Sequence, residues 1–291
     1  MLTRRRALAL SLVALIAPSQ AETKKIPVVA SFSIIGDLVR EVGGDRVSVA
    51  TIVGPDGDAH VYQPSPADGR RIAQARLIFV NGLGFEGWLE RLIAAAKGKG
   101  EVITLGKGVA ARNGEEGVDP HAWQDVANAK IYVEAIRDAL IAADPEGAQV
   151  YKTNADAYLA KLDALDGEIR QAIDALPKER RRVVSTHDAF GYFSARYGVE
   201  FIAPQGVSTE AEVSARDVAK IIDAVRTHKV AAVFLENIAD PRLAKRIASE
   251  TGARMGGVLY SDALSDAKGD GATYIDMMRH NVKQLAKALA P

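Results

Sequence analysis

The chain has 291 residues and no cysteine, and 37 basic side chains balance 37 acidic ones. This even balance offers no basic footprint for nucleic acid or an anionic membrane. Without disulfides, stability must come from a packed core, and the length suffices for one large domain or two of ordinary size.

The amino-terminal segment is typical of a secretory signal peptide. Three arginines, Arg4–Arg6, precede an apolar run at Ala7–Ala17, and Ser19–Ala21 offers small residues for cleavage. The run is far shorter than the roughly 20 residues that cross a bilayer. We therefore expect residues 1–21 to be removed and the mature protein to be periplasmic. We expect no lipid anchor, because a lipoprotein needs a cysteine at the cleavage site.

Downstream of the signal peptide, short apolar strands alternate with amphipathic helices. Near-continuous apolar strands separated by helices predict a parallel sheet covered on both faces. The strands are predicted at residues 26–30, 47–52, 77–81 and 101–105, and the helices at 35–42, 65–75 and 85–96.

The pattern then becomes helical, at 126–140 and again at 148–176. Nearly thirty residues make a helix of roughly 40 Å, long enough to run the length of a small protein. Its single, imperfect apolar stripe favours packing along two lobes over a coiled-coil dimer, so we expect a monomer. The stripe comprises Tyr151, Ala155, Tyr158, Leu162, Leu165, Ile169 and Ile173.

The alternation resumes after Pro177 and predicts a second lobe. Strands are predicted at 183–185, 201–203, 231–235 and 254–258, and helices at 189–197, 214–227, 241–250 and 271–289. The expected fold is α/β: two lobes, each with a mostly parallel four-stranded sheet and flanking helices, joined by a long backbone helix. The predicted organisation is signal peptide 1–21, first lobe 22–145, linking helix 146–177 and second lobe 178–291.

Four side chains, His60, His121, His187 and Asp262, follow predicted strands, His121 after a longer loop. Ligands of open parallel sheets bind beyond the carboxyl ends of the strands, where two facing lobes would bring the four together. Three imidazoles and a carboxylate are a full set of ligands for a transition metal, with no thiolate needed. The sequence therefore predicts a metal site between the lobes.

Each candidate has an ordinary alternative. His60 and His121 could be loop histidines of no special role, and Asp262 could cap a turn or helix. The remaining histidines, His228 and His280, lie on predicted helices and are not expected to bind metal.

Other functions fit the sequence less well. A zinc hydrolase needs an open metal position and a general base, and the chain has no His-Glu-x-x-His helix. A binding protein for an organic solute would line its cleft with aromatic and hydrogen-bonding groups. Repeats or stalks of a structural protein are not visible in the sequence.

Segments around the four candidates resemble the zinc and manganese solute-binding proteins of bacterial ABC importers. The resemblance covers the mature chain and is carried by residues 57–66, 119–123, 185–193, 210–216 and 260–264. It implies a non-enzymatic protein with a rigid helix between its lobes and one metal in the cleft. It implies a membrane permease, driven by an ATPase, as partner. The ligands that it implies are His60, His121, His187 and Asp262.

The third ligand bears on which metal is bound. In the resembling family this position is His or Glu, with Glu more typical of manganese members; here it is His187. Imidazole nitrogen favours Zn²⁺ over the harder Mn²⁺. We predict Zn²⁺ as the transported ligand, with Mn²⁺ as the alternative.

The chain departs from many zinc-binding members of that family in the stretch before His121. Residues 106–118 contain no histidine where those members carry a His- and Asp-rich loop. A periplasmic metallochaperone that delivers the metal is therefore a hypothesis.

A ligating histidine usually donates its other ring N–H to a nearby acceptor. Position in the sequence suggests four carboxylates for this role and three aromatic rings as walls of the cleft. The carboxylates are Asp58, Asp125, Asp188 and Glu236, and the rings are Trp123, Phe190 and Tyr192.

Overall fold

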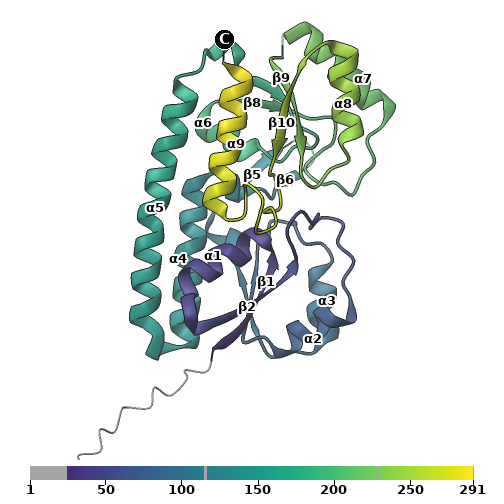
Figure 1. The fold of residues 1–291 in the computed structure, drawn as a ribbon. Coiled ribbons are helices and arrows are strands. Elements are labelled where there is room, and N and C mark those ends of the chain that lie inside the picture. Colours follow the sequence, from purple (N-terminus) through teal and green to yellow (C-terminus); the bar gives the residue numbers. More distant parts are fainter. Residues whose placement is uncertain (1–24, 115–116, 229, 291) are drawn as a thin grey trace, which may run out of the picture.

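The computed structural model describes residues 25–114, 117–228 and 230–290. Two α/β lobes lie one beyond the other, and a long helix runs along one side of both (Figure 1). The predicted signal peptide, residues 1–21, lies outside the described residues. None of the helices described combines the length and apolar character needed to span a membrane.

The first lobe is built on a parallel sheet in the order β2-β1-β3-β4. Its central strand β1 is buried from Val28 to Phe32, which explains the unbroken apolar run in the sequence. The strands are β1 (Ile26–Phe32), β2 (Val47–Val53), β3 (Leu77–Val80) and β4 (Glu101–Thr104). The flanking helices are α1 (Ser33–Gly43), α2 (Pro66–Gln74) and α3 (Leu89–Ala96).

The second lobe repeats this topology with a sheet in the order β10-β9-β7-β8, also parallel. Counted within each lobe, both sheets have the order second-first-third-fourth. The order therefore reverses between β1 and β3 in one lobe and between β7 and β9 in the other, where such sheets bind ligands. The elements are β7 (Arg182–Val184), α6 (Gly191–Tyr197), β8 (Glu200–Ile202), α7 (Ala215–His228), β9 (Ala232–Glu236), α8 (Pro241–Thr251), β10 (Arg254–Leu259) and α9 (Tyr274–Leu289).

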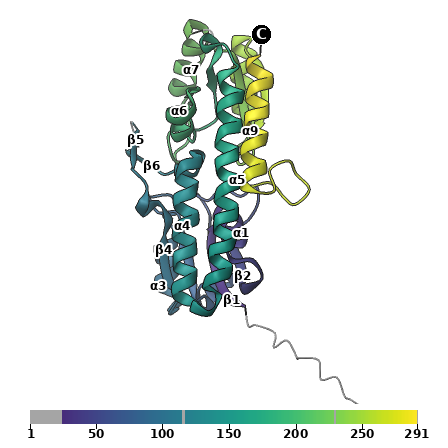
Figure 2. The same cartoon turned by 90° about the vertical axis from the view of Figure 1, so that its left-hand side faces the viewer.

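Two long helices follow the first sheet: α4 (Val126–Ala143), which packs on the first lobe, and the 27-residue α5 (Ala148–Asp174), which connects the lobes. The buried residues of α5 are the seven of the predicted stripe, from Tyr151 to Ile173. Helix α5 packs on α1 and α4 of the first lobe and on α6 and α9 of the second (Figure 2). One hydrophobic core therefore includes residues of both lobes, and a smaller core lies within the second lobe under α7 and α8.

The predicted fold class is confirmed, and two of the local differences lie close to the predicted site residues. A short antiparallel hairpin, β5 (Arg112–Gly114) and β6 (Gly117–Asp119), lies in the stretch before His121, where no strand was predicted. The helix predicted from residue 85 begins only at Leu89. The carboxylate of Glu86 accepts the backbone N–H groups of Asn81 and Gly82, which holds residues 81–86 in a turn.

The remaining elements are short 3₁₀ turns at Gly44–Arg46, Leu105–Gly108, Ala122–Gln124, Pro145–Gly147 and Lys178–Arg180. The predicted boundaries at residues 145 and 177 fall beside two of these turns; the division into lobes at those points stays a prediction.

Candidate metal centre

The four predicted ligand residues come together between the lobes. Each offers one ligand atom, and the four atoms lie within 4.8 Å of one another. The Nε2 atoms of His60 and His121 are 3.3 Å apart. Asp262 Oδ2 lies 3.2 Å from His60 Nε2 and 3.1 Å from His187 Nε2.

These separations suit a tetrahedral metal site. Metal–ligand bonds of about 2.0–2.1 Å place neighbouring ligand atoms about 3.3 Å apart in a tetrahedron. His121 Nε2 and Asp262 Oδ1 are 3.6 Å apart. The described residues give the buried Asp262 Oδ1 no hydrogen-bond partner, so a cation would satisfy an otherwise lone acceptor.

His60 lies in the loop between β2 and α2. Trp88 Nε1 donates to the carbonyl of Ala59 at 2.7 Å, and Asp58 Oδ1 accepts the N–H of His60 at 2.9 Å. The Ser65–Asp68 capping box, with Pro66 at the first helical position, then starts α2 and ends the loop. The backbone around His60 is thus fixed from both sides.

His121 follows β6 and is fully buried. Asp119 Oδ1 accepts the N–H of His121 at 3.0 Å and lies 2.8 Å from its Nδ1. A proton on Nδ1 directed at this carboxylate leaves the Nε2 lone pair facing the centre. Asp119 was not among the carboxylates proposed from sequence, although it stands two residues before its histidine, as Asp58 does.

His187 follows β7 and faces Glu236, the last residue of the neighbouring strand β9. Glu236 Oε1 accepts the N–H groups of Thr186 and His187, and Oε2 makes an ion-pair contact with His187 Nδ1 at 2.6 Å. Burial lowers the pKa of His187, but the charges of Glu236 and Asp262 outweigh burial and hold that pKa well above its ordinary value. Positive charge at this point is therefore stabilised.

Asp262 follows β10 in a loop that the first lobe holds. Trp123 Nε1 and Gln124 Nε2 both donate to the carbonyl of Ser261, at 2.9 and 2.7 Å. Ser33 Oγ accepts the N–H of Leu264. Burial raises the pKa of Asp262, yet His187 and His121 hold that pKa well below its ordinary range, so the carboxylate stays ionised.

Aromatic rings exclude water from one side of the cluster. Trp123, predicted for this role, lies with its ring centroid 5.4 Å from that of His121. Phe85, which was not predicted, lies 4.6 Å from the His60 ring. Phe190 instead stacks on Phe201, and the Tyr192 hydroxyl accepts the N–H of Arg112, so neither serves as a wall of the site.

Of the four carboxylates proposed from sequence, Glu236 faces a ring nitrogen of a proposed ligand as expected. Asp58 instead accepts the backbone N–H of His60. Asp125 caps α4 by accepting the N–H of Ala127. Asp188 is near enough for the charges of His121 and His187 to act on its pKa, which burial raises.

The two histidines not expected to bind metal lie outside the cluster. His228 is exposed at the end of α7. His280 contacts the carbonyl of Val258 and packs on the ring of Tyr260.

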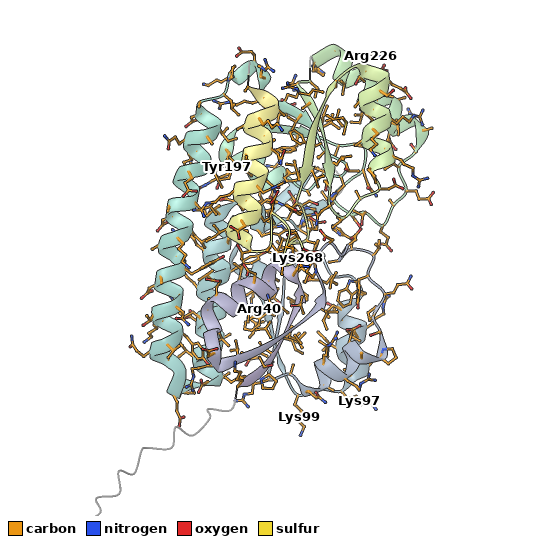
Figure 3. All side chains as sticks on the ribbon, viewed as in Figure 1. Arg40, Lys97, Lys99, Tyr197, Arg226 and Lys268 are labelled. Atoms are coloured by element: carbon orange, nitrogen blue, oxygen red, sulfur yellow. The ribbon has the colours of Figure 1, made fainter. Side chains whose placement is uncertain are left out.

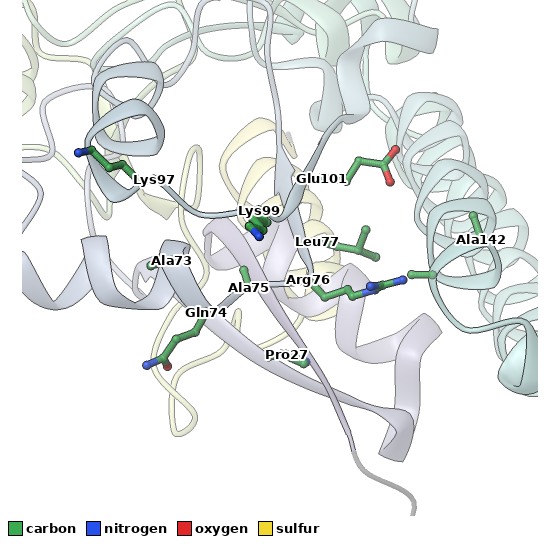
Figure 4. A pocket seen from close by; sticks show the side chains of 11 residues that line it. Pro27, Ala73, Gln74, Ala75, Arg76, Leu77, Lys97, Lys99, Glu101 and Ala142 are labelled. Atoms are coloured by element: carbon green, nitrogen blue, oxygen red, sulfur yellow. The ribbon is translucent and has the colours of Figure 1, made fainter.

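Two hollows differ in their relation to the site. A cleft of about 480 Å³ is lined by His60 together with Leu83, Pro120, Val207 and Ser208, among others. A larger hollow of about 700 Å³ lies at the far end of the first lobe (Figure 4) and contains none of the four candidates. Its basic rim, with Lys97 and Lys99 at the outer end of the molecule (Figure 3), is unsuited to a metal cation.

The family model described as zinc-uptake complex component A, periplasmic, matches residues 28–288. The chain belongs to this family. It is 36% identical to the manganese-binding lipoprotein MntA of Halalkalibacterium halodurans, over 91% of this chain and 89% of that protein. It is 37% identical to the iron-binding protein YfeA of Yersinia pestis, over 91% of this chain and 86% of that protein.

Solved structures agree with this membership of the zinc-uptake component family. The periplasmic zinc binding protein TroA from Treponema pallidum superposes with a TM-score of 0.88 at 32% identity. The match covers 92% of this chain and 100% of that one. The relatives' names thus include zinc, manganese and iron, so membership leaves the metal of this chain open.

Proposed function

We propose that this protein captures one divalent transition metal ion in the periplasm and delivers it to an ABC importer. The observation that carries this proposal is the convergence of three imidazole Nε2 atoms and a buried carboxylate on one point. His60, His121, His187 and Asp262 are the proposed ligands. The partner would be the importer's membrane permease, as membership of the family suggests.

For the metal itself we propose Zn²⁺. Three nitrogen donors and one carboxylate, spaced for a tetrahedron, suit Zn²⁺ better than Mn²⁺, which prefers octahedral oxygen coordination. Mn²⁺ is the second candidate, because several relatives are named for manganese. Several relatives carry the word lipoprotein in their names. The absence of a lipid anchor, expected from the lack of a cysteine, stays a prediction.

We propose a binding role without catalysis and a monomeric protein. A hydrolytic metal site keeps a position open for water, whereas four protein ligands complete a tetrahedron. Delivery of the metal by a periplasmic metallochaperone stays a prediction. Uptake of zinc from a competing chelator at full rate by the isolated protein would argue against that delivery.

The proposal is tested by titrating the metal-stripped mature protein with zinc, and separately with manganese, against a competing chelator. We expect one tightly bound zinc ion, and at least a hundredfold loss of affinity in His187→Ala, which removes one ligand and leaves Glu236 without its partner. His228→Ala, which removes an exposed histidine of α7, is the matched control and should bind as the original protein does.

If the protein retained manganese more tightly than zinc, the proposed importer function would stand and the proposed metal would change to Mn²⁺. Failure to bind either ion tightly would overturn the proposed function.

A further inference from the structure

The carboxylate of Asp58 joins His60 to the opposite lobe. Its Oδ1 accepts the backbone N–H of His60 at 2.9 Å, and its Oδ2 accepts the hydroxyl of Thr209 at 2.6 Å. Thr209 belongs to the second lobe, in the segment between β8 and α7. One side chain therefore connects a proposed ligand of the first lobe to a hydroxyl of the second.

The segment that carries Thr209 is itself tied to another proposed ligand. Gln205 Nε2 donates to the carbonyls of Thr209 and Ala211, at 3.0 and 2.8 Å. Gln205 also pairs with His187 in an isolated β-bridge and accepts the N–H of Asp188. A continuous path of contacts thus runs from His60 through Asp58, Thr209 and Gln205 to His187.

This path lies on the side of the site that opens to solvent. The side chains of His121, His187 and Asp262 are fully buried, and that of His60 is only 3% exposed. Of these four residues, His60 is the one that lines the cleft of about 480 Å³. Val207 and Ser208, beside Thr209, line the same cleft. The loop of His60 and the segment that carries Thr209 therefore border the same cleft.

We propose that Thr209 is a positioning residue that controls metal dissociation. Its hydroxyl, acting through Asp58, holds the His60 loop closed against the second lobe. This inference rests on the proposed function. A hydrogen bond to a carboxylate is stronger than one between neutral groups, so its loss should be measurable in the rate of loop opening.

The test compares Thr209→Val, which keeps the shape and removes the hydroxyl, with Thr209→Ser, which keeps the hydroxyl. Zinc-loaded protein is mixed with excess chromophoric chelator, over a range of chelator concentrations in which the rate no longer changes. We expect zinc to dissociate about tenfold faster from Thr209→Val, and at nearly the original rate from Thr209→Ser. Thr251→Val in α8, where the hydroxyl donates only within its own helix, is the matched control.

A double-mutant cycle separates action through Asp58 from a general loosening. In the Asp58→Ala background, Thr209→Val should add no further acceleration, since the bond is already absent. Hydrogen exchange of the His60 amide gives a readout that needs no metal. That amide should exchange faster in Thr209→Val than in the original protein.

The inference would be overturned if Thr209→Val changed neither the zinc dissociation rate nor the exchange of the His60 amide. It would also be overturned if Thr209→Val accelerated zinc dissociation as much in the Asp58→Ala background as in the original protein. A protein that held neither zinc nor manganese would overturn the proposed function instead. The exchange of the His60 amide would still decide whether Thr209 holds the loop.

Discussion

Behind each fully buried imidazole of the site stands a carboxylate that is not itself a proposed ligand. Asp119 faces Nδ1 of His121, and Glu236 faces Nδ1 of His187. Each also accepts backbone N–H groups, so its position is fixed by the loop that carries the histidine. Burial raises the pKa of Glu236, but contacts with His187 more than offset this and lower it, so the carboxylate stays charged.

This arrangement predicts the effect of Glu236→Gln. Glutamine can still accept the N–H groups of Thr186 and His187, but it removes the charge opposite His187 Nδ1. Loss of such an outer partner typically weakens metal affinity 10- to 100-fold, and we expect zinc affinity to fall by about that factor. Chelator competition measures it. Glu250→Gln, at an exposed position paired with Arg246, makes the same charge change and should leave affinity unaltered.

At this scale the proposed ligands were predictable because each follows a strand, where a parallel sheet places its binding residues. Asp119 was missed even though the spacing Asp-x-His that flags Asp58 occurs there too. Phe85 was missed because an apolar residue at this position is equally consistent with the first residue of the predicted helix 85–96. The contact that turns it toward His60 depends on the fold of residues 81–86 around Glu86.

Among the elements, α1 and α9 meet through a buried charge. Asp37 of α1 accepts the N–H of Tyr274, the first residue of α9, at 2.8 Å. Burial, opposed by this hydrogen bond and reinforced by Glu41, raises the pKa of Asp37 to about 6. Ionising Asp37 therefore costs more free energy in the folded protein than in the unfolded chain, and ionisation lowers the free energy of unfolding. The stability that the protonated form contributes is full at about pH 4 and is lost as the pH rises through 6.

Asp37→Asn should remove this pH dependence. Asparagine stays neutral and keeps an oxygen to accept the N–H of Tyr274. We expect the variant to have a higher free energy of unfolding than the original protein at pH 7.5, by about 1–3 kcal/mol. The difference should shrink toward zero at pH 4. Denaturant unfolding of both proteins across this range measures it, and a gain that stayed constant with pH would contradict the assignment.

The helices and strands of both sheets were predictable from apolar runs and helical spacing. The hairpin of β5 and β6 was not, because strands of three residues such as Arg112–Gly114 carry no alternating apolar pattern. Predicted helix ends were less accurate where a side chain accepts backbone N–H groups, as Glu86 does before α3. Such hydrogen bonds depend on how the chain folds around the side chain, which a local sequence pattern does not show.

At the scale of the whole molecule, α5 joins both lobes to one core. Leu162 is fully buried at its middle. Leu162→Ala should therefore lower the free energy of unfolding by about 2–5 kcal/mol through the cavity that it leaves. Native-state hydrogen exchange should show reduced protection in β1 and in β9 alike.

The exposed Val102 of β4 supplies the control for this prediction. Val102→Ala should change protection little in either lobe. A loss of protection confined to one lobe of Leu162→Ala would mean that the lobes unfold independently.

The two-lobed plan and the linking helix could be predicted because each element has its own local pattern. The bonds that close the site could not. Thr209 and Asp58 are 151 residues apart, and Trp123 and the carbonyl of Ser261 are 138 apart. No local pattern marks a hydroxyl or a carbonyl as the partner of so distant a group.

The loop of Asp262 follows a strand of the second lobe but is hydrogen-bonded to Trp123, Gln124 and Ser33 of the first lobe. The two lobes therefore do not hold the proposed ligands equally. By sequence, each lobe supplies two ligands. The second lobe also holds the loop of Asp262, because Asn237 donates to the carbonyl of Ala263. If the bonds to the first lobe persisted when the lobes separated, the ligands would divide three to one and only His187 would withdraw. A metal ion would then be left with three protein ligands and one free position, the arrangement that allows exchange with an incoming donor. Transfer to an acceptor could thus proceed by substitution, without passing through a bare ion in solution.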